Sequence, residues 1–254
     1  MPIQKTEAII LKSQKLGETS KIITLYSRNY GKIKVVAKGA RGLKSRFFGT
    51  LESLNFISLV FYVKENRNLQ FLSQAEIIKP FIHIKNNLEK LSLASVASEF
   101  ILKSQYADES NPYLFKTILE FLNGLETAST GFENYFCWFQ LKFLKSSGFK
   151  PQLDECVVCK KKNFGSNKFY FSIDRGGCIC SNCKKTATTR VSISQDTLTY
   201  LQFLDRCLPE EISEAKSSTQ VINESTFVLN KFTAYHIEGI EHLKSIKFLE
   251  RIRL

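Results

Sequence analysis

The sequence predicts a multidomain α+β protein in which a small β-barrel precedes an all-helical domain with an inserted cysteine motif. Three observations lead to this fold. Short β-branched and aromatic runs fill residues 1–80, helical periodicity begins after Pro80, and five of the seven cysteines lie between Cys156 and Cys183. We therefore expect domains at 1–80 and 81–254, with the cysteine motif inserted at 151–190.

The first domain is expected to hold five strands, at residues 7–14, 20–27, 31–39, 55–65 and 69–78. In the third, GKIKVVAKG, apolar positions alternate with lysines, so one face would be buried while the other stays charged. A turn at residues 66–68 joins the last two strands. Five short strands predict a closed barrel of the OB type; an SH3-like barrel is the alternative, because the number of strands does not separate the two.

The second domain shows helical spacing of apolar residues in 86–106, 111–126 and 131–149, and again in 194–204, 225–240 and 242–252. Asn111 precedes a proline and is expected to cap the second of these helices, while Gly148 is expected to end the third. A polar stretch at 210–218 separates the later helices.

Composition limits the class of protein. The chain has no apolar run of the roughly 18–20 residues needed to cross a bilayer, and its first residues lack the pattern of a signal peptide. We therefore expect a cytoplasmic protein with no membrane partner. In a reducing compartment, an odd and clustered set of cysteines favours metal binding over disulfides.

The positive charge is unevenly distributed. The net charge is +12, of which residues 1–80 contribute +9 from 14 basic and 5 acidic residues, and residues 81–254 only +3. A compositional bias of the genome would spread lysines along the chain. A basic domain on a nearly neutral body is instead typical of a protein that binds a polyanion.

The cysteine motif has the spacing of a zinc site. Two C-x2-C pairs separated by 20 residues supply four ligands, Cys156, Cys159, Cys180 and Cys183, which match the tetrahedral S4 geometry of one structural Zn²⁺. Cys178 could replace one cysteine of the second pair, but the C-x2-C spacing, which we call a knuckle, favours Cys180 and Cys183. Cys178 is then expected to be a free buried thiol. A catalytic zinc would need an open position, and a redox pair would need a βαβ context; neither is indicated.

A basic loop follows the third predicted strand. VAKGARGLKSRFFG has no acidic residue, and its glycines would let phosphate approach the backbone. We expect nucleic-acid contacts from Lys32, Lys34, Lys38, Arg41, Lys44 and Arg46. Tyr26, Tyr30, Phe47 and Phe48 are candidates for base stacking. The alternative is a place in the core, which for Phe47 and Phe48 is equally consistent with the sequence. The lysines at 160–162 and 184–185 leave a second contact with DNA or a partner open.

Several of these features together resemble the bacterial recombination mediator family RecO. They are Gly17-Glu18, Gly31-Lys32, AKGAR at residues 37–41, Lys44-Ser45, the CxxC…GGxxCxxC register ending at Cys183, and HLKSIKFL at residues 242–249. The resemblance implies a non-enzymatic DNA repair and recombination protein that binds single- and double-stranded DNA and anneals complementary strands. It also implies loading of RecA onto DNA coated by single-strand-binding protein, with RecR and in many bacteria RecF, and binding to the C-terminal tail of single-strand-binding protein.

Two other functions fit parts of the sequence. An RNA-binding protein of translation or transcription could combine an OB barrel and a zinc ribbon, because binding through the backbone hardly distinguishes the sugars. A zinc hydrolase or deaminase would need an acid–base residue beside the knuckle, and the sequence provides no such motif, no clustered carboxylates and no catalytic triad. We therefore expect no catalytic residues.

Overall fold

The structure is a computed structural model that describes residues 2–64, 68–105, 109–162, 169–241, 243–246 and 249. The chain divides into two compact units, one containing residues 1–126 and the end of the chain from Ser245, the other residues 127–244. Among the described residues, no helix combines the length and the apolar character needed to span a bilayer.

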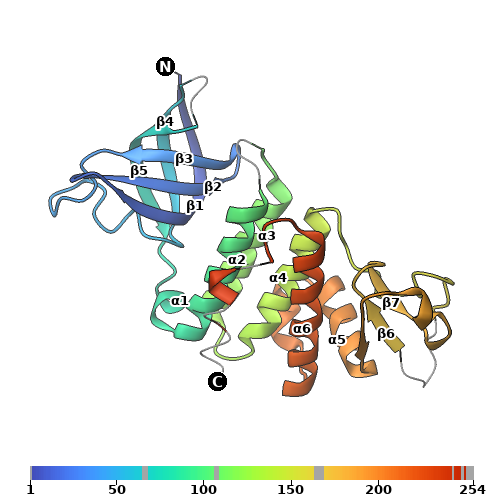
Figure 1. Ribbon diagram of the computed structural model, residues 1–254. Helices are drawn as coiled ribbons and strands as arrows, with labels where there is room; N and C mark the ends of the chain where they lie inside the picture. The colour runs from blue at the N-terminus through green and yellow to red at the C-terminus, as the bar shows by residue number, and fades with distance from the viewer. Residues whose placement is uncertain are drawn as a thin grey trace. The chain divides into compact units, whose positions relative to one another are not determined.

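The first unit begins with a closed five-stranded barrel (Figure 1). Around the barrel the strand order is β1-β2-β3-β5-β4, with β3 and β5 parallel and the other neighbouring pairs antiparallel. This is the five-stranded OB-like barrel that the sequence predicts. The strands are β1 (Ile3–Leu16), β2 (Ser20–Ser27), β3 (Gly31–Ala37), β4 (Phe56–Tyr62) and β5 (Gln70–Lys79).

Alternation along the strands fills the barrel. On β3, Ile33 and Val35 are buried in the barrel core, whereas Lys34 between them is exposed. The long β3–β4 loop contributes Phe47 and Leu51 to the same core. The loop is therefore anchored at these apolar residues, and its charged side chains remain on the surface.

Three helices follow the barrel in the first unit. The Asn87 side chain accepts hydrogen bonds from two N–H groups of the α2 first turn, and Asn111 accepts one from Leu114 N–H at 2.9 Å. The N-cap predicted at Asn111 is thus confirmed. The helices are α1 (Ile82–Asn86), α2 (Leu88–Ser104) and α3 (Pro112–Thr127).

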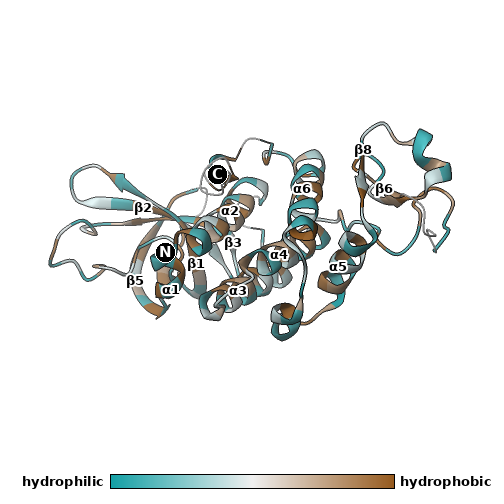
Figure 2. Cartoon of the chain, turned by 90° about the horizontal axis from the view of Figure 1, so that it is seen from below, coloured by the Kyte–Doolittle hydropathy of each residue, from teal (hydrophilic) through white to brown (hydrophobic). Residues whose placement is uncertain are grey.

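The second unit is helical, with a small sheet inserted between α4 and α5. Hydrophobic and hydrophilic residues alternate along its helices (Figure 2). The last long helix starts earlier than expected from the sequence, because Ser218 caps it by accepting from Val221 N–H, and the polar stretch before it forms a 3₁₀ helix. The bounds are α4 (Phe132–Ser146), α5 (Gln195–Arg206), η2 (Pro209–Glu214) and α6 (Thr219–His236).

The inserted sheet has the strand order β7-β6-β8, and a short 3₁₀ helix follows β7. We call residues 151–190 the metal module. Its elements, with the strand that follows it, are β6 (Phe169–Ser172), β7 (Gly177–Ile179), η1 (Ser181–Thr186) and β8 (Arg190–Ile193). The turn expected at 66–68 and the helix expected at 242–252 fall largely outside the described residues.

Candidate metal centre and candidate nucleic-acid interface

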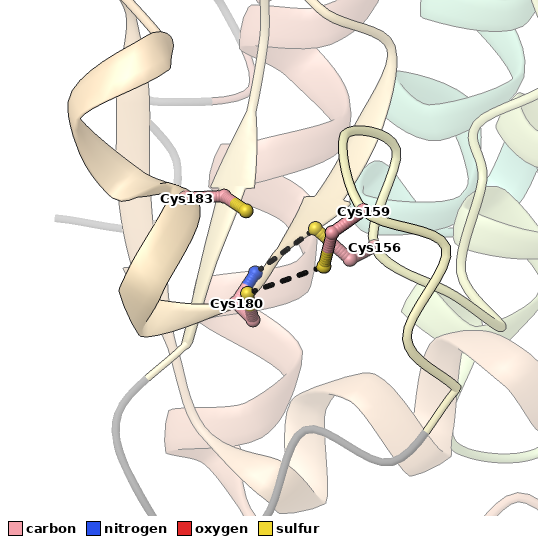
Figure 3. Close-up of side chains that lie close together, drawn as sticks. All are labelled: Cys156, Cys159, Cys180 and Cys183. Atoms are coloured by element: carbon pink, nitrogen blue, oxygen red, sulfur yellow. Dashed lines mark hydrogen bonds between the residues drawn. The ribbon is translucent and has the colours of Figure 1, made fainter.

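The four predicted cysteine ligands come together in the metal module. The sulfur atoms of Cys156, Cys159, Cys180 and Cys183 all lie within 4.8 Å of one another. Figure 3 shows them facing each other across the gap between the first knuckle and the start of η1. Each pair sits in a tight turn: Lys160 N–H donates to Cys156 O at 2.9 Å, and Cys183 N–H donates to Cys180 O at 3.0 Å.

The spacing of the sulfur atoms suits a tetrahedral metal ion. Four thiolates at about 2.3 Å from Zn²⁺ would lie about 3.8 Å from each other. The Sγ atoms of Cys159 and Cys180 are 3.7 Å apart, and these cysteines are free rather than joined in a disulfide. The donor set is therefore one that could hold a metal ion that prefers sulfur.

The four thiols differ in their electrostatics: hydrogen bonds lower the pKa of Cys156, whereas the hydrogen bond with Cys180 raises the pKa of Cys183. Burial raises the pKa of the Cys156 thiol, but backbone N–H groups donate to its sulfur and bring the pKa down to about 6. One of them is Cys180 N–H, 3.4 Å from Cys156 Sγ. Hydrogen bonds accepted by the Cys156 sulfur stabilise its thiolate, which is the form that binds a metal ion.

Cys178 is separate from this cluster. Its side chain is fully buried on β7, and burial raises the pKa of its thiol to about 12. A protonated, enclosed thiol is neither a good nucleophile nor a good ligand. This agrees with its expected place as a buried free thiol.

Two glycines fix the second knuckle. Gly176 has a φ of +86°, a left-handed conformation that suits glycine. A Cβ atom at Gly177 would lie 2.3 Å from Gln152 O, because the chain leading to the first knuckle passes directly over this residue. Hydrogen bonds from Gln152 N–H to Gly176 O and from Cys178 N–H to Gln152 O join the two segments at 2.9 and 2.8 Å. The glycine pair thus positions one cysteine pair against the other.

The barrel carries a groove across three strands. In the strand register Val36 on β3 pairs with Phe71 on β5, and Phe71 pairs with Tyr62 on β4. These residues line a groove of about 640 Å³ together with Lys38 and Arg46. The ammonium of Lys38 lies over the Phe71 ring, 5.1 Å from its centroid. The groove therefore combines two partly exposed aromatic rings with two cations.

The predicted basic residues have different environments. Lys34 and Lys44 are exposed and, like Lys38 and Arg46, lie on the outer surface of the barrel. Lys32 donates to Leu102 O in the last turn of α2 at 2.9 Å, and burial, followed by the charge of Lys34, lowers the pKa of Lys32. Arg41 donates through its guanidinium to Gly17 O and so ties the basic loop to the β1–β2 turn. Lys38 and Arg46 are the two that share the groove.

The four aromatic residues expected from the sequence to stack on bases differ in their exposure. Tyr26 and Phe47 are buried and Tyr30 packs against the barrel core, so these three are structural, while Phe48 is 68% exposed. Sequence reasoning missed Tyr62 and Phe71. The alternation of inward and outward residues on their strands indicates that both side chains face outward. Only the pairing of β4 with β5 and of β5 with β3 shows that the two rings lie in one row.

Comparison with known proteins places the chain in a family. The model for "Recombination protein O N terminal" matches residues 1–81, and the model for "Recombination protein O C terminal" matches residues 85–246. The chain belongs to the RecO family. Proteins named DNA repair protein RecO are similar over nearly their whole length: 32% identity in Caldanaerobacter subterraneus subsp. tengcongensis, covering 94% of both chains, and 31% in Thermoanaerobacter sp. strain X514, covering 100% of this chain and 99% of the relative.

A third RecO relative, from Syntrophus aciditrophicus, is 32% identical over 98% of this chain and 96% of its own. The RecO models begin and end near the boundary between the barrel and α1. Both the barrel and the metal module therefore lie within the matched length of this RecO-family DNA repair protein.

Proposed function

We propose that this chain is a non-enzymatic mediator of recombinational repair that binds DNA through the groove formed by Val36, Lys38, Arg46, Tyr62 and Phe71. The observation that carries the proposal is the combination in this groove of cations for phosphates and aromatic rings for bases. Lys34 and Lys44 extend the basic surface around it. Lys32 and Arg41 contribute charge while also holding α2 and the β1–β2 turn.

The proposed activity has several parts. Bound strands lose part of their mutual repulsion when phosphates are neutralised, which favours annealing of complementary strands. In the cell the chain would assist RecA loading onto single strands coated by single-strand-binding protein, together with RecR and, where present, RecF. It would bind the acidic tail of single-strand-binding protein and act in the cytoplasm on the nucleoid. Family membership and the basic barrel support these assignments.

The metal in this proposal is one structural Zn²⁺ held by the four clustered cysteines. Four thiolates complete a tetrahedral shell and leave no open position for a water nucleophile, which supports a structural ion and a protein that is not an enzyme. Zinc would supply cross-linking of the two knuckles. Metal analysis of the purified protein should find about one Zn²⁺ per chain, and a folded chain with a Cys156–Cys159 disulfide and no metal would contradict the assignment.

A strand-annealing assay with and without single-strand-binding protein tests the activity. We expect faster annealing of complementary strands, including strands already coated. Matched DNA and RNA oligomers in competition distinguish the proposal from an RNA-binding role in translation or transcription. A clear preference for RNA, with no annealing of DNA, would refute the repair assignment.

Replacing Phe71 with leucine tests the groove itself. Leucine keeps an apolar side chain on β5 but removes the ring beneath Lys38. Stacking of one base is worth about 1–3 kcal/mol, so single-strand affinity should fall by about 5- to 150-fold while the salt dependence stays the same. Phe48→Leu, at an exposed ring outside the groove, is the matched control. Equal effects of the two variants would remove the groove from the interface.

A further inference from the structure

The metal module contains two similar basic segments. The first cysteine pair reads CVVCKKK and the second CSNCKK, so in each the last ligand is followed directly by lysines. Since all four sulfur atoms lie within 4.8 Å of one another, both lysine segments start from the same centre. A metal ion that joins the knuckles therefore also fixes the two basic segments beside each other.

These segments lie on the solvent side of the centre. Cys156 and Cys180, the first residues of the pairs, are buried, whereas Cys159 is exposed and Cys183 is partly exposed. The short helix η1, drawn in teal beside β6 in Figure 2, is hydrophilic. All five lysines that follow the two pairs are exposed: Lys160, Lys161, Lys162, Lys184 and Lys185.

The acidic residues of the module do not neutralise this surface. Asp154 pairs with Arg206, and Glu155 pairs with Lys160 at 3.3 Å. Asp174 accepts hydrogen bonds from Ser172 and Thr188 and is directed toward the strand ends. Among the described residues, the remaining four lysines form no ion pair. We call Lys161, Lys162, Lys184 and Lys185 the lysine surface.

Charge on the metal centre does not account for these lysines. A divalent ion with four thiolates carries a net charge of −2, which two lysines would balance. Residues 151–190 have eight basic and three acidic residues, a net charge of +5, while the rest of 81–254 has fourteen basic and sixteen acidic residues. The module remains positive after compensation, on a helical body that is slightly negative.

We propose that the lysine surface is a second binding site for the phosphate backbone of a nucleic-acid strand, separate from the barrel groove. This inference rests on the proposed DNA-binding function and extends it: each unit of the chain has its own backbone site. One molecule can then hold two strands at once, which is the arrangement that annealing requires. Among the described residues no aromatic ring stacks on these lysines, so the site recognises charge and not base identity.

The test compares two variants with the same loss of charge. The module variant has glutamine in place of Lys161, Lys162, Lys184 and Lys185. The barrel variant has glutamine in place of Lys34, Lys38, Lys44 and Arg46. The measurements are affinity for one short single strand, and capture of a second, differently labelled strand by protein already saturated with the first. Metal content and melting temperature are recorded for both proteins.

We expect the module variant to retain its metal and to bind the first strand within about twofold of the parent. Its capture of the second strand and its annealing rate should fall at least tenfold. The reason is that each phosphate contact raises log K by about 0.7 when salt is lowered from 1 M to 0.1 M, and the variant loses these contacts. Unchanged capture and annealing would overturn the second site. If instead the barrel variant binds its first strand normally, the proposed groove fails, whatever the module variant does.

A measurement on the unaltered protein covers the case in which the module variant loses its metal. Lysine acetylation mapped by mass spectrometry should show protection of the lysine surface when DNA is bound in excess, but not when only the first strand is present. Lys116, Lys216 and Lys231, which are also exposed, should stay reactive throughout. Absence of protection, or protection by an acidic peptide but not by DNA, would refute the inference.

Discussion

Neutralising the barrel groove gives the sharpest test of the proposed interface. The variant replaces Lys38, Lys44 and Arg46 with glutamine, which removes three positive charges while retaining polar side chains. Lys38 and Arg46 line the groove and Lys44 lies in the same loop. Within the described parts of the chain, none of the three side chains donates to a backbone carbonyl in the way that Lys32 and Arg41 do, so we expect the melting temperature to change little.

The size of the effect follows from counterion release. Each phosphate contact with a single strand contributes about 0.7 to the slope of log K against log salt, so three contacts contribute about 2. At 0.1 M salt the same three contacts are worth about two log units of affinity relative to 1 M salt, or about 3 kcal/mol. The variant should therefore bind about 100-fold more weakly at 0.1 M salt, and with a visibly flatter salt dependence.

Fluorescence anisotropy of a labelled oligonucleotide, titrated at several salt concentrations, measures both quantities. The matched control replaces Lys116, Lys216 and Lys231, which are exposed and lie outside both the barrel and the metal module. It loses the same charge, so it reports how much a lower net charge alone weakens binding. If the two variants show the same slope, the attraction is a property of the whole chain and the groove has no special part in it.

Three further predictions concern the metal module. Removing the metal with a chelator, or replacing Cys156 with serine, should unfold the metal module and lower the melting temperature. No catalytic activity should be lost, because the proposed zinc is structural. Calorimetry and metal analysis follow the change. Gly177→Ala should cost about 1–3 kcal/mol in chemical denaturation, since its Cβ would displace Gln152 O and break two hydrogen bonds; a cost below 0.5 kcal/mol would argue against this close approach. Cys178→Ala should keep the same metal content, because the Cys178 thiol is buried away from the four clustered sulfur atoms, and loss of the metal would make it a ligand.

Much of the fold could be predicted because its signals are local. Alternation on β3 and the turn residues around it depend on neighbours in the chain, and β2 begins and ends where the sequence indicates, at Ser20 and Ser27. The start of α6 was missed because its cap at Ser218 follows a polar stretch that resembles a loop. Capping by a single serine is a weak signal compared with the apolar spacing further along the helix.

The sequence by itself determined which four cysteines could hold a metal ion, since a C-x2-C pair places two sulfur atoms on one short turn wherever that turn lies in the fold. It also determined that positive charge is concentrated in the barrel. Only the tertiary structure decided which residues share a surface. Val36 is far from Tyr62 and Phe71 in the chain and lines up with them only through strand pairing. Tyr26 is not available for nucleic-acid contacts because the barrel buries it. Register and burial are set by the closed sheet as a whole, so no single stretch of sequence contains them.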